Sequence, residues 1–339
     1  MIRCNYNRNM EDRIMRYRNV GKAGLKVSEI AVGSWMTNLK GNEQQETAAA
    51  VIRLAYEKGV NFFDCADAYS GGEAEKFLGR ILKNYARNSI VVSSKVFFPT
   101  GDTVNEKGLS RKHIIENIDR SLKNMDMEYL DLYYCHRFDQ STPMEETLRT
   151  LSGLVDQGKI LYYGVSEEWG GARIEAAERI ISEYKLHPLT VIQPQYHMMD
   201  RYIEHEIMDI CEKYGIGITP FSPLAQGLLT GKYKKGQPFP EGSRATYQAD
   251  KQVNQLLTDE NLDKVEQLEK IAWELGTNLP VLALAWILRK GIISSVITGA
   301  SRKEQLENNI AASGFDIPED VLGRIEEILD FQPFERHVG

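Results

Sequence analysis

The sequence has 339 residues, of which 42% are hydrophobic and 26% are charged, and its formal net charge is −7. These values are typical of a globular protein with a substantial core, and the acidic balance argues against nucleic acid or an anionic membrane surface as the main partner. No apolar run is long enough for a membrane span, and the N-terminus lacks the apolar region of a signal peptide, so we expect a cytoplasmic protein.

The first features along the chain are an extension and a hairpin. Residues 1–14 are polar and rich in arginine, without periodicity, and we expect a disordered extension, so that residues 15–339 form one domain. Between residues 17 and 30, the turn-forming groups Asn19-Val20-Gly21 and Ala23-Gly24 predict a β-hairpin.

From residue 30 onward, short apolar runs alternate with amphipathic stretches every ~30–40 residues, the size of one strand–helix unit. Eight such units predict a parallel sheet closed as an α/β (β/α)8 TIM barrel, since the Gly-x-Gly-x-x-Gly turn of an open dinucleotide-binding sheet is absent. The predicted strands cover residues 30–32, 60–64, 90–94, 130–135, 161–165, 189–192, 216–221 and 294–298. Helices are predicted at residues 43–58, 73–82, 110–124, with Ser110 as N-cap, and 143–157, between Pro143 and Gly158.

Two segments lie outside this repeat. Residues 234–257, rich in Gly, Pro, Lys and Gln, are too long for an ordinary connection and are expected to be a functional lid or a disordered loop. Residues 318–331 predict an extra C-terminal helix, whose end can reach back over the barrel mouth.

Four polar residues stand at or just past the ends of three consecutive predicted strands: Asp64, Tyr69, Lys95 and His136. A barrel places the carboxyl ends of its strands around one mouth, so we expect these side chains to meet there. A lysine ammonium is expected to lower the phenol pKa from its usual value of about 10, and an aspartate to keep that lysine charged. With a neutral histidine to orient a carbonyl oxygen, the set is typical of general acid–base catalysis, whereas Asp67 is interpreted as a turn residue.

Longer motifs surround these residues. They are residues 24–28 (Gly-Leu-Lys-Val-Ser), Phe63-Asp64 with Ala68-Tyr69, Ser94-Lys95, Tyr134-Cys135-His136-Arg137, Gly164-Val165-Ser166, residues 222–233 (Ser-Pro-Leu-Ala-Gln-Gly-Leu-Leu-Thr-Gly-Lys-Tyr) and Gly299-Ala300-Ser301. In combination, from about Met15 to the C-terminal helix, they resemble the aldo-keto reductases, in the branch that includes potassium-channel beta subunits and their bacterial relatives. We call Asp64, Tyr69, Lys95 and His136 the tetrad, after the set that they resemble in that family.

The resemblance implies an NADPH-dependent reduction of aldehydes or ketones to alcohols, with Tyr69 as general acid and a small-molecule carbonyl compound as partner. The implied NADPH-binding residues are Ser34, Trp35, Asp64, Ser166, Gln193, Phe221, Ser222, Pro223, Leu224, Gln226, Gly227, Lys232, Arg244, Gly299, Ser301, Arg302, Gln305, Asn308 and Asn309. The nicotinamide carboxamide is assigned to Ser166 and Gln193, and the 2′-phosphate to Ser301 and Arg302. Gln305 and Asn309 are assigned to the adenosine. An arginine suits a phosphate because its planar fork donates two parallel hydrogen bonds, which favours NADPH over NADH.

Within this assignment, the pyrophosphate would be lined by Ser222, Leu224, Gln226, Gly227 and Lys232, with Arg244 on the long loop closing over it. Two positions depart from the family pattern. Channel beta subunits carry Asn where this chain has His136, the commoner residue in competent reductases, so catalysis is expected to be intact. Relatives often carry Glu at the position of Asn308, where it would contact the adenine amine.

Two alternatives stay open at this point. A redox-sensing regulatory subunit would bind NADPH tightly and turn over slowly, and a Schiff-base aldolase would use Lys95 as a nucleophile. Trp35, Phe97 and Trp169 follow strand ends and are candidates for a substrate pocket, and a homo-oligomer is compatible with the sequence. The four cysteines, Cys4, Cys65, Cys135 and Cys211, lack zinc-ligand or redox-pair spacing, so no metal site is expected.

Overall fold

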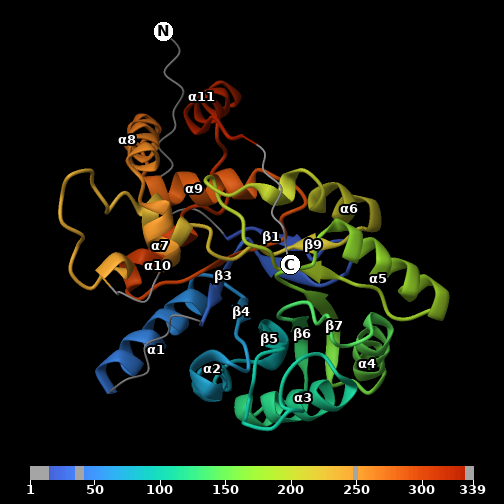
Figure 1. The fold of residues 1–339 in the computed structure, drawn as a ribbon. Coiled ribbons are helices and arrows are strands. Elements are labelled where there is room, and N and C mark those ends of the chain that lie inside the picture. The colour runs from blue at the N-terminus through green and yellow to red at the C-terminus, as the bar shows by residue number, and fades with distance from the viewer. Residues whose placement is uncertain (1–14, 35–41, 247–250, 333–339) are drawn as a thin grey trace.

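A ring of eight parallel strands forms the centre of the computed structural model, which describes residues 15–34, 42–246 and 251–332 (Figure 1). The strands are β3 (Ile30–Gly33), β4 (Phe62–Asp64), β5 (Val91–Val96), β6 (Leu130–Cys135), β7 (Ile160–Val165), β8 (Val191–Ile192), β9 (Gly217–Ile218) and β10 (Val296–Thr298). They are hydrogen-bonded in the order β10-β3-β4-β5-β6-β7-β8-β9. Each lies in or overlaps a predicted strand, which confirms the expected barrel units.

Backbone hydrogen bonds also join the two ends of this strand order. Ile218 of β9 donates to the Ile292 carbonyl at 3.2 Å and accepts from the amide of Ser294 at 2.8 Å. Further along, the Ile297 amide of β10 donates to the Pro220 carbonyl at 2.9 Å. The sheet therefore curls round until β9 meets the segment that leads into β10, as a TIM barrel requires.

Helices cover the outside of the strands (Figure 1). They are α1 (Asn42–Glu57), α2 (Glu73–Leu82), α3 (Arg111–Met125), α4 (Met144–Asp156), α5 (Gly171–Tyr184), α6 (Ile207–Tyr214), α7 (Lys251–Leu256), α8 (Asp259–Glu274), α9 (Leu279–Leu288), α10 (Lys303–Ile310) and α11 (Glu319–Leu329). The predicted cap of α3 is confirmed, because Ser110 Oγ accepts from the His113 amide at 3.3 Å. Strands and helices thus alternate along the chain, as the sequence pattern indicates.

The interior of the ring is filled from its amino-terminal end by apolar side chains. Val20 and Val27 of the hairpin pack there with Phe62, Leu132 and Ile297. The hairpin strands β1 (Tyr17–Asn19) and β2 (Lys26–Ser28) pair antiparallel, as expected. Because side chains alternate along a strand, the residues two positions after this apolar layer point into the barrel again, nearer its carboxyl end.

The long segment 234–257 contains two short helices in its described part, η6 (Arg244–Thr246) and α7, and Val253 of α7 is fully buried. The extra C-terminal helix is confirmed as α11. Its Glu326 Oε1 accepts from Trp286 Nε1 at 3.0 Å and from Arg289 at 3.3 Å, and Glu326 Oε2 also pairs with Arg201. These contacts fix α11 against α9 and the loop after β8.

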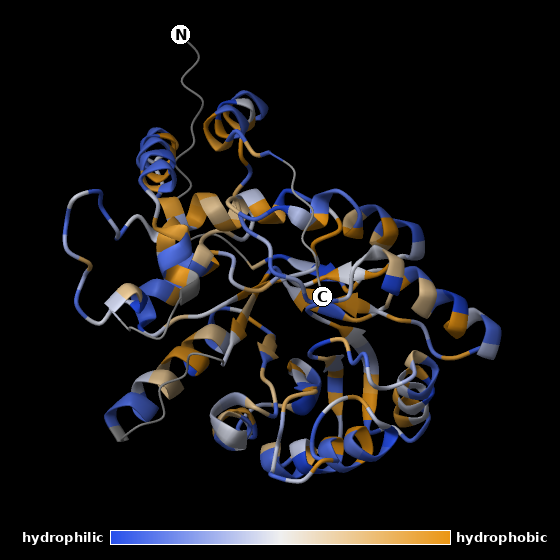
Figure 2. Ribbon diagram, in the orientation of Figure 1, coloured by the Kyte–Doolittle hydropathy of each residue, from blue (hydrophilic) through white to orange (hydrophobic). Residues whose placement is uncertain are grey.

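Hydropathy distinguishes α9 from the other outer helices. Nine of its ten residues are buried, Pro280 being the exception, and Figure 2 colours most of it in hydrophobic tones. Within the described residues, no single helix has the length and hydropathy for a membrane span; only α8 and α9 taken together do, and they are bent by 89°. The predicted extension, residues 1–14, lies outside the described residues.

Candidate active site

Asp64 and Lys95 form a buried ion pair inside the carboxyl end of the barrel. Lys95 Nζ lies 2.6 Å from Asp64 Oδ2 and donates to the Cys65 carbonyl, also at 2.6 Å. The other carboxylate oxygen, Asp64 Oδ1, accepts from Ser93 Oγ at 2.7 Å and from Gln193 Nε2 at 3.0 Å. Burial opposes the charge on Lys95, but the adjacent carboxylate outweighs it and raises the pKa of Lys95 above its usual value. The expectation that Asp64 keeps the lysine charged is therefore confirmed.

Tyr69 lies in the first turn after β4, at the start of the short helical segment η2 (Tyr69–Gly72). Its phenol oxygen is 3.4 Å from Lys95 Nζ, and that ammonium is 5.0 Å from the centre of the Tyr69 ring. The next three residues, Ser70, Gly71 and Gly72, have positive φ angles of 52°, 65° and 93°. Glycine adopts this region without a steric penalty, so the turn can reverse sharply and present the phenol to Lys95.

The expected lowering of the phenol pKa is wrong in its net direction. Burial raises the pKa of Tyr69 to about 12, and the nearby Lys95 ammonium opposes this rise without reversing it. The contact of 3.4 Å is too long for a strong charge-assisted hydrogen bond, which explains why burial prevails. At neutral pH the proton therefore stays on Tyr69.

His136 completes the tetrad from the end of β6. Its ring meets that of Tyr69 edge-on, with the ring centres 5.8 Å apart, and meets Phe98 at 4.9 Å. Burial, together with the charges of Lys95 and Arg137, lowers the pKa of His136 well below its usual value. The imidazole is therefore neutral, as expected, and its Nδ1 has no hydrogen-bond partner among the described residues.

Aromatic side chains flank His136 on the side of β5. Phe97 meets Phe98 edge-on at 5.4 Å, which extends the contact between Phe98 and His136 into an apolar wall. Trp169 is buried, but its ring packs on Phe138, at 5.2 Å. Trp35 lies outside the described residues. Of the three residues expected in a substrate pocket, Phe97 is the one that this wall includes.

Two residues assigned to the nicotinamide carboxamide lie side by side. Ser166 Oγ donates to the Gln193 carbonyl at 2.7 Å, and the Gln193 side chain reaches Asp64, as described above. Ser34 lies on the other side of Asp64, where its Oγ donates to the Asp64 carbonyl at 2.9 Å. The sequence analysis missed Ser93, although its position two residues before Lys95 on one strand face was a usable signal.

The residues assigned to the pyrophosphate gather in the loop after β9 and in η5 (Ala225–Thr230). Gln226 Nε2 donates to Ser222 Oγ at 2.9 Å, and Arg244 donates to Gln226 Oε1. Gly227 has a φ of 100°, and a Cβ there would lie 3.0 Å from Lys232 Nζ. The missing side chain therefore lets the Lys232 ammonium lie close to the backbone of η5, where it can pair with a phosphate, so these residues fit the dinucleotide that the resemblance implies. Three further assigned residues lie in the same loop. Phe221 forms a parallel β-bridge with Gln195, Pro223 is buried, and Leu224 is partly buried.

The residues assigned to the adenosine and 2′-phosphate lie between β10 and α10. The amide and hydroxyl of Ser301 both donate to Gln305 Oε1, at 2.8 and 3.0 Å. Arg302 is exposed at the amino end of α10, where the helix dipole also favours an anion. Asn309 is buried, 3.5 Å from the Gly299 carbonyl, whereas the side chain of Asn308 accepts from Asn278 at 2.9 Å.

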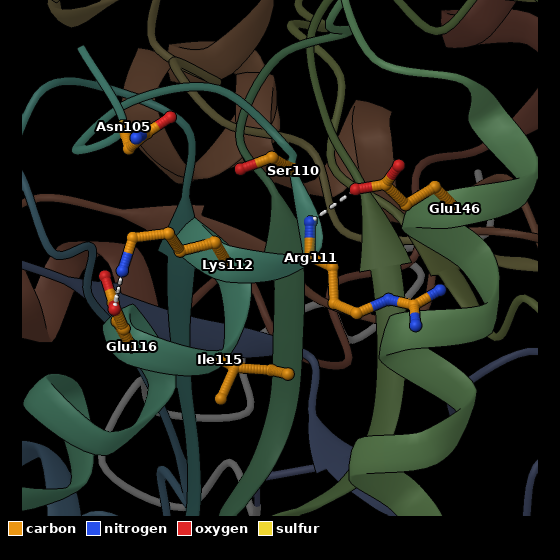
Figure 3. Close-up of a pocket in the computed structure, with 7 residues that line it drawn as sticks. All are labelled: Asn105, Ser110, Arg111, Lys112, Ile115, Glu116 and Glu146. Atoms are coloured by element: carbon orange, nitrogen blue, oxygen red, sulfur yellow. Dashed lines mark hydrogen bonds and ion pairs between the residues drawn. The ribbon is translucent and has the colours of Figure 1, made fainter.

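A surface cavity of about 570 Å³ lies at the start of α3 and contains none of the predicted site residues (Figure 3). Its polar groups already pair with one another: the Arg111 amide donates to Glu146 at 2.9 Å, and Lys112 pairs with Glu116. Within the described ranges, no group of three His, Cys, Asp or Glu side chains is arranged to hold a metal ion. The tetrad at the barrel mouth is therefore the stronger candidate.

Asp67 differs from its interpretation as a simple turn residue. It is 1% exposed, and Asn117 of α3 donates to it at 2.7 Å. Burial and the nearby Glu75 carboxylate raise its pKa to about 7. The sequence carried a signal for this contact with α3. Three polar residues are spaced to share one face of that helix, on its otherwise apolar side: Asn117, Arg120 and Asn124.

Comparisons with known proteins agree with this geometry. A probable voltage-gated potassium channel subunit beta from Oryza sativa subsp. japonica is 40% identical over 327 residues, covering 94% of this chain and 98% of the relative. The corresponding protein from Arabidopsis thaliana is 42% identical over 327 residues, with the same coverage. A putative voltage-gated potassium channel subunit beta from Schizosaccharomyces pombe is 39% identical over 328 residues, covering 94% of each chain. The pattern of the aldo/keto reductase family matches residues 29–330, and the chain belongs to that family.

Proposed function

We propose that this protein, with residues 15–339 as one catalytic domain, reduces aldehydes or ketones to alcohols with NADPH. The observation that carries the proposal is the buried Asp64–Lys95 pair, which lies 3.4 Å from a phenol that keeps its proton at neutral pH. A proton donor beside a neutral histidine suits a reaction that creates an alkoxide. The match to the aldo/keto reductase family supports the same oxidoreductase class.

The tetrad residues have separate roles in this proposal. NADPH, when bound, supplies a hydride to the carbonyl carbon. Tyr69 gives its proton to the carbonyl oxygen, and the Lys95 ammonium stabilises the phenolate that remains. Asp64 keeps Lys95 charged, and neutral His136 orients the carbonyl oxygen by a hydrogen bond. Phe97 and Phe98 exclude water from the same side, which strengthens these electrostatic interactions.

The cofactor residues follow the family assignment. Ser166 and Gln193 would hold the carboxamide, Ser222, Gln226 and Lys232 the pyrophosphate, and Ser301 with Arg302 the 2′-phosphate. The support for this part is chemical: Gly227 lets the Lys232 ammonium lie close to the backbone of η5, and an exposed arginine stands at the start of α10.

The decisive experiment compares wild type with Tyr69→Phe in single-turnover NADPH oxidation over a panel of aldehydes and ketones. We expect the rate of hydride transfer to fall by roughly 10²–10⁴-fold, the range for loss of a general acid, while NADPH binding is preserved. A Tyr69→Phe variant with the wild-type rate would overturn the assignment of the acid.

A second candidate function comes from the names of the relatives, which are potassium channel beta subunits. A regulatory subunit of this kind would bind NADPH tightly and release NADP slowly. Stopped-flow measurement of hydride transfer and of cofactor release separates the two: a reductase turns over repeatedly, whereas a sensor completes one turnover and then retains NADP.

The aldolase alternative conflicts with the state of Lys95. A Schiff base requires a neutral amine with a free lone pair, but Lys95 is fully buried, paired with Asp64, and has a raised pKa. Borohydride with an aldehyde should therefore leave Lys95 unmodified, and a trapped adduct on Lys95 would exclude the reductase mechanism.

A further inference from the structure

Asp67 connects the turn that carries Tyr69 to two other parts of the barrel. Asp67 Oδ1 accepts from the Ala68 amide at 2.6 Å, and Oδ2 accepts from Asn117 Nδ2 at 2.7 Å. The Asp67 amide also donates to the Lys95 carbonyl, at 3.4 Å. A residue two positions before Tyr69 is thus joined to α3 on one side and to the strand of Lys95 on the other.

A second buried carboxylate holds the far end of the same turn. Glu75 in the first turn of α2 is fully buried, and its Oε2 accepts from Asn124 Nδ2 at 2.8 Å. Its Oε1 accepts from Ser94 Oγ at 2.6 Å, on the outer face of β5 beside Lys95. Asn117 and Asn124 lie on one face of α3, since seven residues are close to two helical turns. That face therefore contacts both sides of the turn.

We call residues 67–72 the tyrosine turn. Its other backbone bonds are short-range. The Tyr69 amide donates to Ala66, at 3.1 Å, the Gly71 amide to Ala68, at 3.2 Å, and the Glu73 amide to Tyr69 and Ser70. Three consecutive residues with positive φ follow Tyr69, an arrangement that persists only where the surrounding structure holds it. The phenol position therefore depends on the anchors at the two ends.

We propose that Asp67 is a positioning residue for Tyr69: its hydrogen bonds to Asn117 and to the Ala68 amide fix the tyrosine turn so that the phenol stays beside Lys95. The inference rests on the proposed reductase function, in which that phenol is the acid. Asp67 touches neither substrate nor cofactor in this assignment and acts only through the turn.

Other charged and titratable groups face Asp67. They are Glu75 of α2, Arg120 of α3 and Tyr133 of β6, and Asn117 Nδ2 also lies 3.3 Å from Tyr133 Oη. Burial and the Glu75 carboxylate raise the pKa of Asp67 to about 7. The carboxylate accepts both hydrogen bonds at once, and the protonated acid can accept from the Ala68 amide while its O–H donates to Asn117 Oδ1, so the contact can form in both states.

Three variants test the proposal, each measured by single-turnover NADPH oxidation. Asp67→Ala and Asn117→Ala remove the contact from its two sides and should lower the rate by roughly 10–100-fold, as expected for a misplaced reacting group, with KM within about twofold of wild type. Asp67→Asn should restore most of the rate, because its oxygen can accept from Ala68 while its amide donates to Asn117 Oδ1, which has no partner among the described residues. The rates of wild type and of Asp67→Asn should depend on pH in the same way near pH 7, because the protonated acid and the amide make the same pair of contacts.

The matched control is Asp131→Ala. Asp131 is also a buried carboxylate, paired with Arg87 at 2.6 Å and bonded to the Val92 amide at 2.8 Å, but at the opposite end of the barrel from Tyr69. It should lower the melting temperature and leave the rate unchanged. If either alanine variant at the Asp67–Asn117 contact does not fold, the other and the restored rate of Asp67→Asn decide the question.

A readout that needs no turnover separates this inference from the proposed function. NMR of protein labelled at the tyrosine ζ-carbons, with Tyr69→Phe to assign the resonance, reports the surroundings of the phenol. A resonance that shifts in Asp67→Ala and returns in Asp67→Asn supports the positioning role even if no carbonyl compound is reduced. An active enzyme whose rate and Tyr69 resonance are both unaffected by Asp67→Ala would overturn it.

Discussion

The side-chain amide of Gln193 donates a hydrogen bond of 3.0 Å to Asp64 Oδ1, although the two residues are 129 positions apart in the chain. Gln193 ends β8 and Asp64 ends β4, on nearly opposite sides of the ring, so the contact crosses the interior of the barrel. A residue assigned to the nicotinamide is thus also a direct partner of the carboxylate that keeps Lys95 charged. The residue assigned to the carboxamide and the tetrad are therefore joined by a direct hydrogen bond.

Breaking the Asp64–Lys95 ion pair should lower both the stability and the activity of the protein. In Asp64→Asn, Lys95 is left as a buried ammonium without a counter-ion, and we expect a loss of about 3–5 kcal/mol in the free energy of unfolding. The rate of carbonyl reduction should fall as well, because a buried Lys95 without its counter-ion gives up its proton more easily, and a neutral lysine does not stabilise the phenolate. Denaturant unfolding and single-turnover kinetics measure the two effects.

Asp131→Asn is the matched control for that variant, since it removes the charge from another buried carboxylate that pairs with a cation, Arg87. It should lower stability while the reduction rate of the remaining folded protein stays at the wild-type value. Equal losses of rate in Asp64→Asn and Asp131→Asn would show that the effect reports general destabilisation.

Arg302 should determine the preference between the two nicotinamide cofactors. Its exposed guanidinium at the start of α10 is suited to the 2′-phosphate, which NADPH has and NADH lacks. Arg302→Ala should weaken NADPH binding by roughly tenfold or more, the value of one charge-assisted contact, and should leave NADH binding within about twofold. Fluorescence titration with both cofactors measures this, and Lys112→Ala, an exposed cation at the cavity of Figure 3, is the control. Equal effects on both cofactors would place the 2′-phosphate elsewhere.

The stability of the protein should depend on pH through Asp67. Its pKa is raised from 3.8 to about 7, so the folded state favours the protonated form, and the stability that this form contributes is present below pH 3.8 and lost as the pH rises through about 7. Asn at this position cannot ionise. Asp67→Asn should therefore gain stability relative to wild type between pH 4 and pH 8, by roughly 3–5 kcal/mol.

Melting temperatures of wild type and Asp67→Asn across that pH range test the linkage. A difference that stays constant with pH would mean that Asp67 does not titrate between these values. A difference that grows as the pH rises toward 7 would show a buried carboxylate whose ionisation lowers the stability of the fold.

Glu326 should be required for the attachment of α11. Its carboxylate accepts from Trp286 and Arg289 and pairs with Arg201, so Glu326→Ala leaves two partly buried arginines without this partner. We expect a loss of about 1–3 kcal/mol and earlier proteolytic removal of the C-terminal helix, while the tetrad geometry is preserved. Glu327→Ala, its neighbour on the same helix, should have little effect; similar cleavage in both would contradict this role for Glu326.

The sequence by itself determined the eight strand–helix units and the positions of the tetrad. Apolar runs ending in Asp64, Lys95 and His136 recur at a spacing that only a closed parallel sheet brings together, and the family motifs assign the cofactor residues around them. Local patterns suffice for this because strand alternation and helix caps depend on neighbours in the chain.

Only the tertiary structure decided the charge states and the partners across the barrel. Tyr69 keeps its proton because burial outweighs the lysine 3.4 Å away, and no sequence spacing reports burial. The same holds for Asp67, which reads as a turn residue in the chain but is enclosed by α2, α3 and β6, where Asn117 reaches it across 50 positions. Desolvation and long-range hydrogen bonds depend on which elements pack together, and that packing exists only once the ring has closed.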